Sequence, residues 1–385
     1  MKLLKFTEKL LVDRDFKKIL LFFLIWKLSL FFILCLSYLF IPLAGKSFLG
    51  GGFDSYQSNP LIFSWANFDG EHYLNIIQNG YQHLNHSFFP LYPLFTSVMS
   101  LFSKAPMVIV SVGLIISNLA FVISLFLMFK LVLIDYPKKI AYLTIYLFFL
   151  FPTSFYFGAF YTESLFLLFS VATVYLFKKD RFLLATIFGI LASATRIGGV
   201  ILLPVLIIEW YQGRKRQFPY QILLILLGLL SYMVYLYFTT GDYLAFYHEL
   251  SAFGEQRQGN FVLLPQVFFR YINILFNVNP LTHIYWSALI EMVSAITILL
   301  LLIYGYFRKV RLSYLIYGLI AFLLPTFTGS FSSLPRYFIT IFPLFIILSI
   351  FISKRDQITK MLIFLLLGLL LIIETSLFLR GYWVS

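Results

Sequence analysis

The sequence predicts an all-α integral membrane protein, which we expect to cross the bilayer about eleven times. Two features of composition support this fold class. Of the 385 residues, 61% are hydrophobic and only 12% are charged, whereas soluble domains carry about 25% charged residues. A third feature is that the apolar residues form long runs, interrupted by short basic segments. The chain, residues 1–385, is interpreted as a single transmembrane domain.

The apolar runs that can cross the membrane follow one another along the whole chain. They lie at residues 19–41, 107–133, 140–157, 160–177, 219–239, 284–306, 312–330, 336–352 and 358–379. Each is near or above the ~20 residues that a helix needs to span the hydrocarbon core. The first run is too long for a signal peptide and lacks a convincing cleavage site, so we expect it to remain as an anchor.

Lysine and arginine residues gather between these runs, a distribution typical of cytoplasmic loops. The clusters lie at residues 2–18, 137–139, 178–181, 214–216, 308–311 and 354–360. The segment 182–208 then joins two basic clusters that are both expected in the cytoplasm, so it must enter the membrane and return to the same side. The stretch SATRIGG, residues 193–199, supplies a turning point, and we expect two half-helices that meet at Arg196. The alternative is a single span with the RKR cluster on the unexpected side.

Composition and motifs also exclude several function classes. The net charge of +13 is dispersed in these clusters and forms no continuous basic face, so nucleic acid is not an expected partner. The single cysteine, Cys35, excludes an intramolecular disulfide and a cysteine-based metal site. Neither the P-loop pattern nor the G-x-G-x-x-G dinucleotide pattern is present.

The predicted topology places two long loops outside, at residues 42–106 and 240–283. These loops carry every histidine of the chain, whereas the cytoplasmic loops are short and basic. We therefore expect the chemistry on the outer face, with 42–106 as the catalytic loop. The second loop, with Tyr243, Tyr247, His248, Arg257 and Arg270, is expected to pack over the first and to help bind a substrate.

The first outer loop contains the stretch WANFDGEHYLNIIQNGYQHLNHSFFPLYPLF, residues 65–95. A short helix here would place Asp69, His72 and Tyr73 on one face, because they lie three and four residues apart, while Glu71 would point elsewhere. The surrounding aromatic residues suit a membrane interface or the floor of a sugar site. On these local features alone, Asp69 is either a helix cap or a catalytic group.

Three blocks of the sequence resemble the PIG-V family, of the GPI mannosyltransferase 2 type. FDGEHYLNIIQNGY followed by SFFPLYPL is similar to the family's first-loop signature. FPTSFYFGAFYTESLF (151–166) with ASATRIGG (192–199) resembles its middle region, and SSLPRYFITIFPLF (332–345) its late element. This chain departs from the signature at Phe68, where the family has Trp, and at Ile77, where it has Ala.

The resemblance implies a multi-spanning glycosyltransferase of the GT-C class. Such enzymes take a sugar from a polyprenyl-phosphate carrier and attach it, with inversion, to an acceptor hydroxyl on the outer or luminal face. The aspartate of the first loop acts as base, which here is Asp69. The resemblance and the short loops suggest a bacterial relative in the plasma membrane with its site outside; a eukaryotic relative would act in the lumen of the endoplasmic reticulum.

A departing polyprenyl phosphate needs cations and hydrogen-bond donors. Arg196, Arg336 and Arg257 are the candidates for binding it, although Arg196 can instead pair with a structural acid such as Glu163, and Arg336 can be an interfacial anchor. Asp54 and Glu163 are further candidates for the base, and His72 can orient Asp69 or bind phosphate. Residues expected to contact the substrate are Glu71, Trp65, Tyr73, Tyr81 and His248.

Two alternatives stay open from the sequence. A divalent metal held by His83, His86, His72 and Glu71 is possible but not indicated, because the spacing is irregular. No other cofactor is expected. The rival function is a polytopic transporter or lipid flippase without bond-making chemistry, which we expect to place its charges at the bilayer midplane instead of in outer loops. An intramembrane acyltransferase is disfavoured, because no histidine lies in a predicted span.

Overall fold

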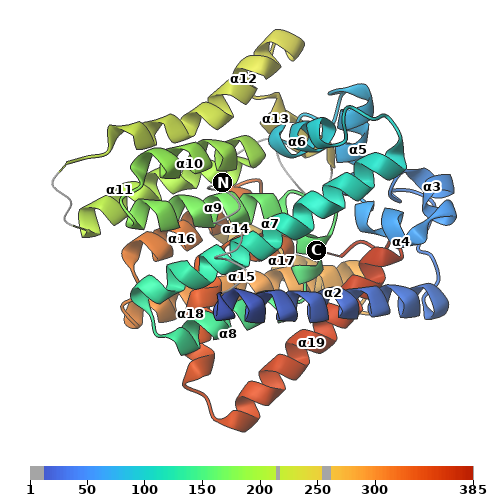
Figure 1. Cartoon of the computed structure of the whole chain (residues 1–385). Coiled ribbons are helices and arrows are strands. Elements are labelled where there is room, and N and C mark those ends of the chain that lie inside the picture. The colour runs from blue at the N-terminus through green and yellow to red at the C-terminus, as the bar shows by residue number, and fades with distance from the viewer. Residues whose placement is uncertain (1–12, 214–216, 254–261, 385) are drawn as a thin grey trace.

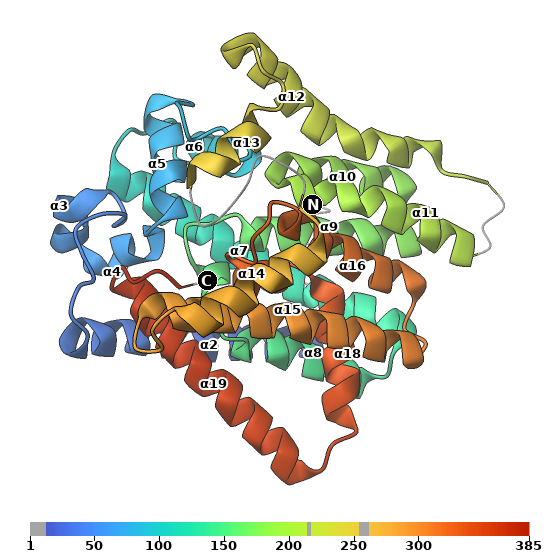
Figure 2. The ribbon, with the colours of Figure 1, turned by 180° about the vertical axis from the view of Figure 1, so that it is seen from behind.

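A computed structural model describes residues 13–213, 217–253 and 262–384, and the regular elements within these ranges are all helical. Figures 1 and 2 show them packed into one bundle, with α12 and α19 projecting from opposite ends. Five are long and apolar enough to cross a membrane: α2 (Arg14–Phe40), α7 (Pro106–Asp135), the η4–α12 pair (Tyr220–Thr240), α15 (His283–Phe307) and α19 (Gln357–Leu379). The prediction of an all-helical integral membrane protein is confirmed; the number of crossings remains a prediction.

Shorter apolar helices complete the bundle. They are α8 (Lys138–Leu150), α9 (Glu163–Lys178), α10 (Phe182–Thr195), α11 (Leu202–Gln212), α16 (Leu312–Thr326) and α18 (Phe342–Ser353). The central packing is that of α9 against α7 on one side and α10 on the other, while α8 packs on α18 and α2 on α19. Glutamate begins α9 and lysine ends it, an arrangement that complements the helix dipole.

Two predicted spans were too long at the end nearest the site. The run 140–157 contains α8, which stops at Leu150, and then the short 3-10 helix η2 (Ser154–Gly158). Pro152 explains the stop, because the residue before a proline is driven out of the helical region, and Phe151 is extended. The run 336–352 is likewise divided into α17 (Leu334–Phe338) and α18, which has Pro343 in its first turn.

The predicted interruption at Arg196 is confirmed. Helix α10 ends at Thr195, Arg196 is extended (φ −155°, ψ 149°), and the chain continues as the 3-10 helix η3 (Ile197–Ile201) and then α11. Gly199 allows the tight return, because a Cβ on it would lie 2.2 Å from the backbone nitrogen of Ser193. The break therefore places an arginine side chain inside an otherwise apolar layer.

Short helices build the two loops that were expected outside. The first loop contains α3 (Gly52–Ser58), α4 (Pro60–Phe63), η1 (Ser64–Ala66), α5 (Asp69–Asn79) and α6 (Leu91–Met99). The second contains α13 (Ala245–His248), η5 (Glu249–Phe253) and α14 (Leu264–Asn277). Figures 1 and 2 both show α13 beside α5 and α6.

Among the described residues of the second loop, its first part packs on the first loop. The Glu249 carboxylate lies 2.6 Å from the His86 Nδ1, and the Ser87 hydroxyl donates to the Phe246 carbonyl at 3.1 Å. Helix α14 instead packs on α15 and α16. The expected packing of one loop over the other is thus seen for α13 and η5.

Candidate active site

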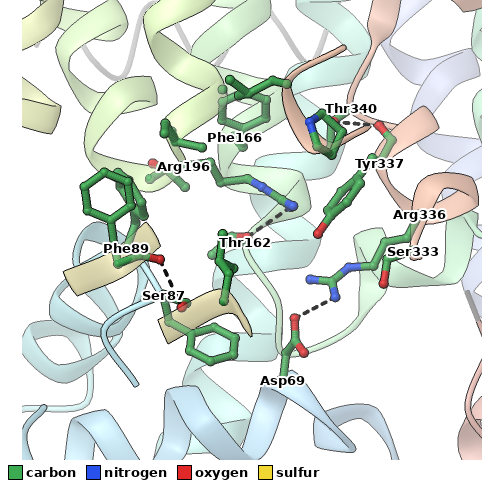
Figure 3. A pocket seen from close by; sticks show the side chains of 18 of the residues that line it. Asp69, Ser87, Phe89, Thr162, Phe166, Arg196, Ser333, Arg336, Tyr337 and Thr340 are labelled. Atoms are coloured by element: carbon green, nitrogen blue, oxygen red, sulfur yellow. Dashed lines mark hydrogen bonds and ion pairs between the residues drawn. The ribbon is translucent and has the colours of Figure 1, made fainter. Parts of the chain in front are cut away.

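A cavity of ≈ 720 Å³ lies where α5, α13, α16, α17, the start of α9 and the break at Arg196 meet. Its polar wall includes the side chains of Asp69, His72, Tyr73, Arg196, Arg336 and Tyr337. Figure 3 shows Asp69 and Arg336 joined by a dashed line, with Arg196 directed toward Thr162. Most of the remaining lining is aromatic or aliphatic, so charged groups in it face a largely apolar space.

Asp69 is the first residue of α5, and its position depends on the hydrogen bonds of Asn67. The Asn67 side chain accepts from the Gly50 N–H at 2.9 Å and donates to the Phe378 carbonyl at 2.8 Å. Phe68 then adopts a positive φ of 56°, and the helix begins without a side-chain cap. The Asp69 carboxylate is therefore not used as a helix cap. It faces the cavity and accepts from the Arg336 Nη1 at 2.6 Å.

Arg336 projects from α17 between two carboxylates. Its Nε donates to the Glu163 Oε1 at 2.6 Å, and its Nη1 donates to Asp69. The guanidinium also lies 4.6 Å from the ring centroid of Tyr161 and 5.0 Å from that of Tyr156. The side chain is only 7% exposed. Arg336 is thus a fixed, buried cation and not an interfacial anchor.

Arg196 binds Glu163 at the same oxygen as Arg336 does. Its Nη1 donates to the Glu163 Oε1 at 2.7 Å and approaches the Thr162 hydroxyl at 3.4 Å. The guanidinium lies 5.3 Å from the ring centroid of Tyr337, a favourable cation–π distance. The side chain is 19% exposed. The pairing with Glu163 that the sequence left open is therefore present, and Arg196 also lines the cavity.

Two carboxylates and two guanidiniums thus form one neutral group, which we call the outer cluster: Asp69, Glu163, Arg196 and Arg336. Burial acts to raise the pKa of Asp69, but Arg336, with smaller contributions from His72 and Arg196, holds that pKa below its usual value of 3.8. The Asp69 carboxylate is consequently charged at neutral pH. It is also the more accessible acid, since its side chain is 24% exposed and that of Glu163 is 0% exposed.

The turn before α17 is held by residues that the sequence did not single out as part of the site. Ser333 has a positive φ of 61°, and its N–H donates to the Glu291 Oε1 at 3.2 Å. The Tyr271 hydroxyl donates to the other Glu291 oxygen at 2.5 Å and accepts from the Phe331 N–H at 3.0 Å. A buried acid in an apolar span is the signal that points to this support. It orients the helix that carries Arg336.

His72 and Tyr73 line the cavity beside Asp69. The His72 ring stacks on Phe88 with centroids 4.6 Å apart, and its Nδ1 lies 2.8 Å from the Asn85 Oδ1. The Tyr73 hydroxyl donates to the Thr162 hydroxyl at 3.5 Å. Asp69, His72 and Tyr73 therefore share one helix face, as the spacing predicted.

Four of the predicted substrate contacts do not line this cavity. Trp65 is buried, with the Lys27 ammonium 4.9 Å from its ring centroid. Glu71 points away, as expected, and accepts from the Gly52 N–H at 3.3 Å; burial raises its pKa to about 7. The Tyr81 hydroxyl donates to the Phe88 carbonyl, and His248 pairs with Asp242.

The remaining candidates for the base, the phosphate site and the metal site also lie away from the cavity or outside the described residues. Asp54 lies in α3 with an exposed side chain, outside the cavity wall. Glu163 lies behind the wall. Arg257 lies outside the described residues. Within the described residues, no group of three His, Cys, Asp or Glu side chains is placed to hold a metal ion. His86, one of the proposed ligands, pairs with Glu249.

The sequence profile of the family described as mannosyltransferase (PIG-V) matches residues 16–213, just over half of the chain. The chain belongs to this mannosyltransferase family. The resemblance inferred from the three sequence blocks is thereby confirmed at the level of the PIG-V family. The matched region contains Asp69, Glu163 and Arg196, and Arg336 lies beyond it.

Solved structures of an oligosaccharyltransferase from Archaeoglobus fulgidus are distantly similar to this family member. One, tethered with an acceptor peptide, has a TM-score of 0.43 at 13% identity and covers 93% of this chain and 55% of that chain. The apo form has a TM-score of 0.44 at 14% identity, with 93% and 56% covered. This chain therefore spans about half the length of those chains. No curated protein matches its sequence.

Proposed function

We propose that this protein transfers a mannosyl residue from a polyprenyl-phosphate donor to an acceptor hydroxyl group, with inversion at the anomeric carbon. The acceptor is a lipid or glycan, and the site faces the outer side of a bacterial plasma membrane on a GT-C-type scaffold. The observation that carries the proposal is the meeting of one accessible carboxylate, Asp69, with two guanidiniums, Arg196 and Arg336, at one largely apolar cavity.

In the proposed reaction the acceptor oxygen attacks the anomeric carbon while the bond from that carbon to the phosphate oxygen breaks. The bonding electrons leave with the phosphate, and the acceptor proton passes to Asp69. Arg196 and Arg336 supply the positive charge and the N–H donors that the departing phosphate needs. The products are a mannoside and a polyprenyl phosphate. His72, which lines the cavity beside Asp69, would contact the acceptor in this proposal.

The ion pair between Asp69 and Arg336 has a consequence for the order of events. A carboxylate whose pKa is held low by a cation is a weak base. A donor phosphate that binds Arg336 would share its positive charge and so raise the pKa of Asp69. Asp69 would then become a stronger base when the donor is bound. Before donor binding, its low pKa would keep the carboxylate from taking up a proton from water.

The test is transfer of radiolabelled mannose from polyprenyl-phosphate-mannose into lipid or glycan extracts by membranes that contain the protein. We expect Asp69→Asn to lower the rate about 10²–10⁴-fold, the usual contribution of a general base. Asp54→Asn is the matched control, because Asp54 is exposed and outside the cavity wall, and it should leave transfer unchanged.

Equal transfer by wild type and Asp69→Asn would remove Asp69 as the base. Transfer from another polyprenyl-phosphate sugar but not from the mannose donor would overturn the choice of sugar. Movement of the labelled donor across sealed vesicles without any glycosylated product would favour the transporter or flippase instead.

A further inference from the structure

Glu163 is the one member of the outer cluster that the proposed reaction does not use. Its side chain is 0% exposed, and it lies behind the cavity wall at the first turn of α9. A carboxylate so placed cannot touch a substrate in the cavity. Burying a charge of this kind is costly unless it is compensated, so its partners indicate its role.

Both guanidiniums converge on a single oxygen of this carboxylate. The Arg336 Nε lies 2.6 Å and the Arg196 Nη1 2.7 Å from the Glu163 Oε1. The Oε2 has no hydrogen-bond partner in the described parts of the chain. One oxygen therefore holds two cations side by side, although they come from segments far apart in the sequence. Without the shared anion, the two guanidiniums would repel each other in a poorly solvated site.

The two arginines depend on Glu163 to different degrees. Arg336 has a second carboxylate partner in Asp69, and two aromatic rings flank it. Arg196 is paired with no carboxylate but Glu163 among the described residues. It also lies in the irregular backbone between α10 and η3, where no helix fixes its direction. Loss of Glu163 should therefore release Arg196 first.

We propose that Glu163 is a positioning residue that holds Arg196 against Arg336, so that the two guanidiniums bind one phosphate together. The inference rests on the proposed function for the identity of that phosphate, the head of a prenyl-linked donor. A guanidinium has five N–H donors in a plane, so the contacts to Glu163 and Asp69 leave other donors available, and both arginines line the cavity. Glu163 thus acts through Arg196 and touches neither the sugar nor the acceptor.

The test uses the purified full-length protein and farnesyl phosphate as probe, with its Kd measured by isothermal titration. We expect Glu163→Gln and Arg196→Gln each to weaken binding roughly tenfold or more, the effect of losing one charge-assisted hydrogen bond. The double variant should be no weaker than either single one, because both changes remove the same contact. A role confined to folding would not produce this non-additive pattern.

The matched control is Glu209→Gln. Glu209 is also a buried glutamate, 4% exposed at its side chain, and its two oxygens accept from Arg311 at 3.2 and 2.5 Å. It does not line the cavity. This variant should lose thermal stability much as Glu163→Gln does, while its Kd for farnesyl phosphate stays within about twofold of wild type.

Additive losses in the double variant, or a Glu163→Gln protein that binds as wild type does, would overturn the inference. So would a wild-type protein that does not bind farnesyl phosphate. Because binding is measured without turnover, the two proposals fail separately. Non-additive binding without mannose transfer would remove the proposed function and keep the positioning role, whereas transfer with additive binding would do the reverse.

Discussion

The two ends of α9 carry charge clusters with the same balance of acidic and basic side chains but with different surroundings. At its first turn lies the outer cluster, built on Glu163. At its last turn lies an inner cluster of Asp135, Lys178, Glu209 and Arg311, which ties together α7, α9, α11 and the start of α16. The helix is sixteen residues long, or about 24 Å at 1.5 Å per residue. Each cluster has two acids and two bases.

The inner cluster is completed by hydroxyl groups. The Ser313 hydroxyl donates to the Glu209 Oε2 at 2.7 Å, and the Tyr314 hydroxyl donates to the Asp135 Oδ2 at 3.0 Å. None of its four members lines the cavity of Figure 3. In the outer cluster, Asp69 and both arginines do line it, and one Glu163 oxygen is unpartnered within the described chain. Charge pairing alone is common to both clusters. The comparison indicates that charged groups left incompletely paired at a cavity distinguish a candidate active site from a cluster that only holds helices together.

The largest expected difference between the clusters comes from matched arginine substitutions. Arg336→Lys keeps the charge, but an ammonium cannot reproduce the planar contacts to Asp69 and Glu163 together with those to a phosphate. We expect the transfer rate per folded protein to fall about 100-fold or more. Arg311→Lys should change that rate less than about twofold and mainly lower thermal stability. Rates and melting curves in detergent measure both, and equal rate losses would break the comparison.

A smaller effect is expected in the pH dependence of the reaction. Arg336 holds the pKa of Asp69 below 3.8, so the carboxylate stays charged as the pH falls from neutral. The value of kcat/KM for the donor reports the donor-free enzyme. It should therefore show no decline from protonation of Asp69 between about pH 8 and about pH 5. An acid limb in that range that persists in Glu71→Gln would contradict the assignment.

The smallest effect concerns Glu71, which lies on the same short helix as Asp69. Its carboxylate accepts from the Gly52 N–H and forms no ion pair within the described residues. Burial raises its pKa to about 7 from an ordinary 4.5. Its folded-state pKa lies above the unfolded one, so the folded state loses stability as the pH rises through this interval. We expect Glu71→Gln to melt at a higher temperature than wild type at about pH 8 and at the same temperature near pH 4.5. Equal melting temperatures at both pH values would show that Glu71 is better solvated than its position indicates.

Sequence patterns were sufficient for several parts of this site. Helical spacing placed Asp69, His72 and Tyr73 on one face, and the Arg-Gly interruption located the break at Arg196. Both are local properties, set by the chain within a few residues. The same patterns could not show that Trp65 and Tyr81 face away from the cavity, since aromatic composition does not specify direction.

The sequence by itself determined the membrane class, the helical content, the family and the position of the broken segment, because hydrophobic length, basic clusters and motif order are all written along the chain. Only the tertiary structure decided that Glu163 takes both arginines on one oxygen, that Asp69 is the acid which reaches the cavity, and that Glu291 and Tyr271 hold the turn before Arg336. The physical reason is distance along the chain. These groups come from segments that are far apart in sequence, and only the packing of α9 against its neighbours brings their charges together.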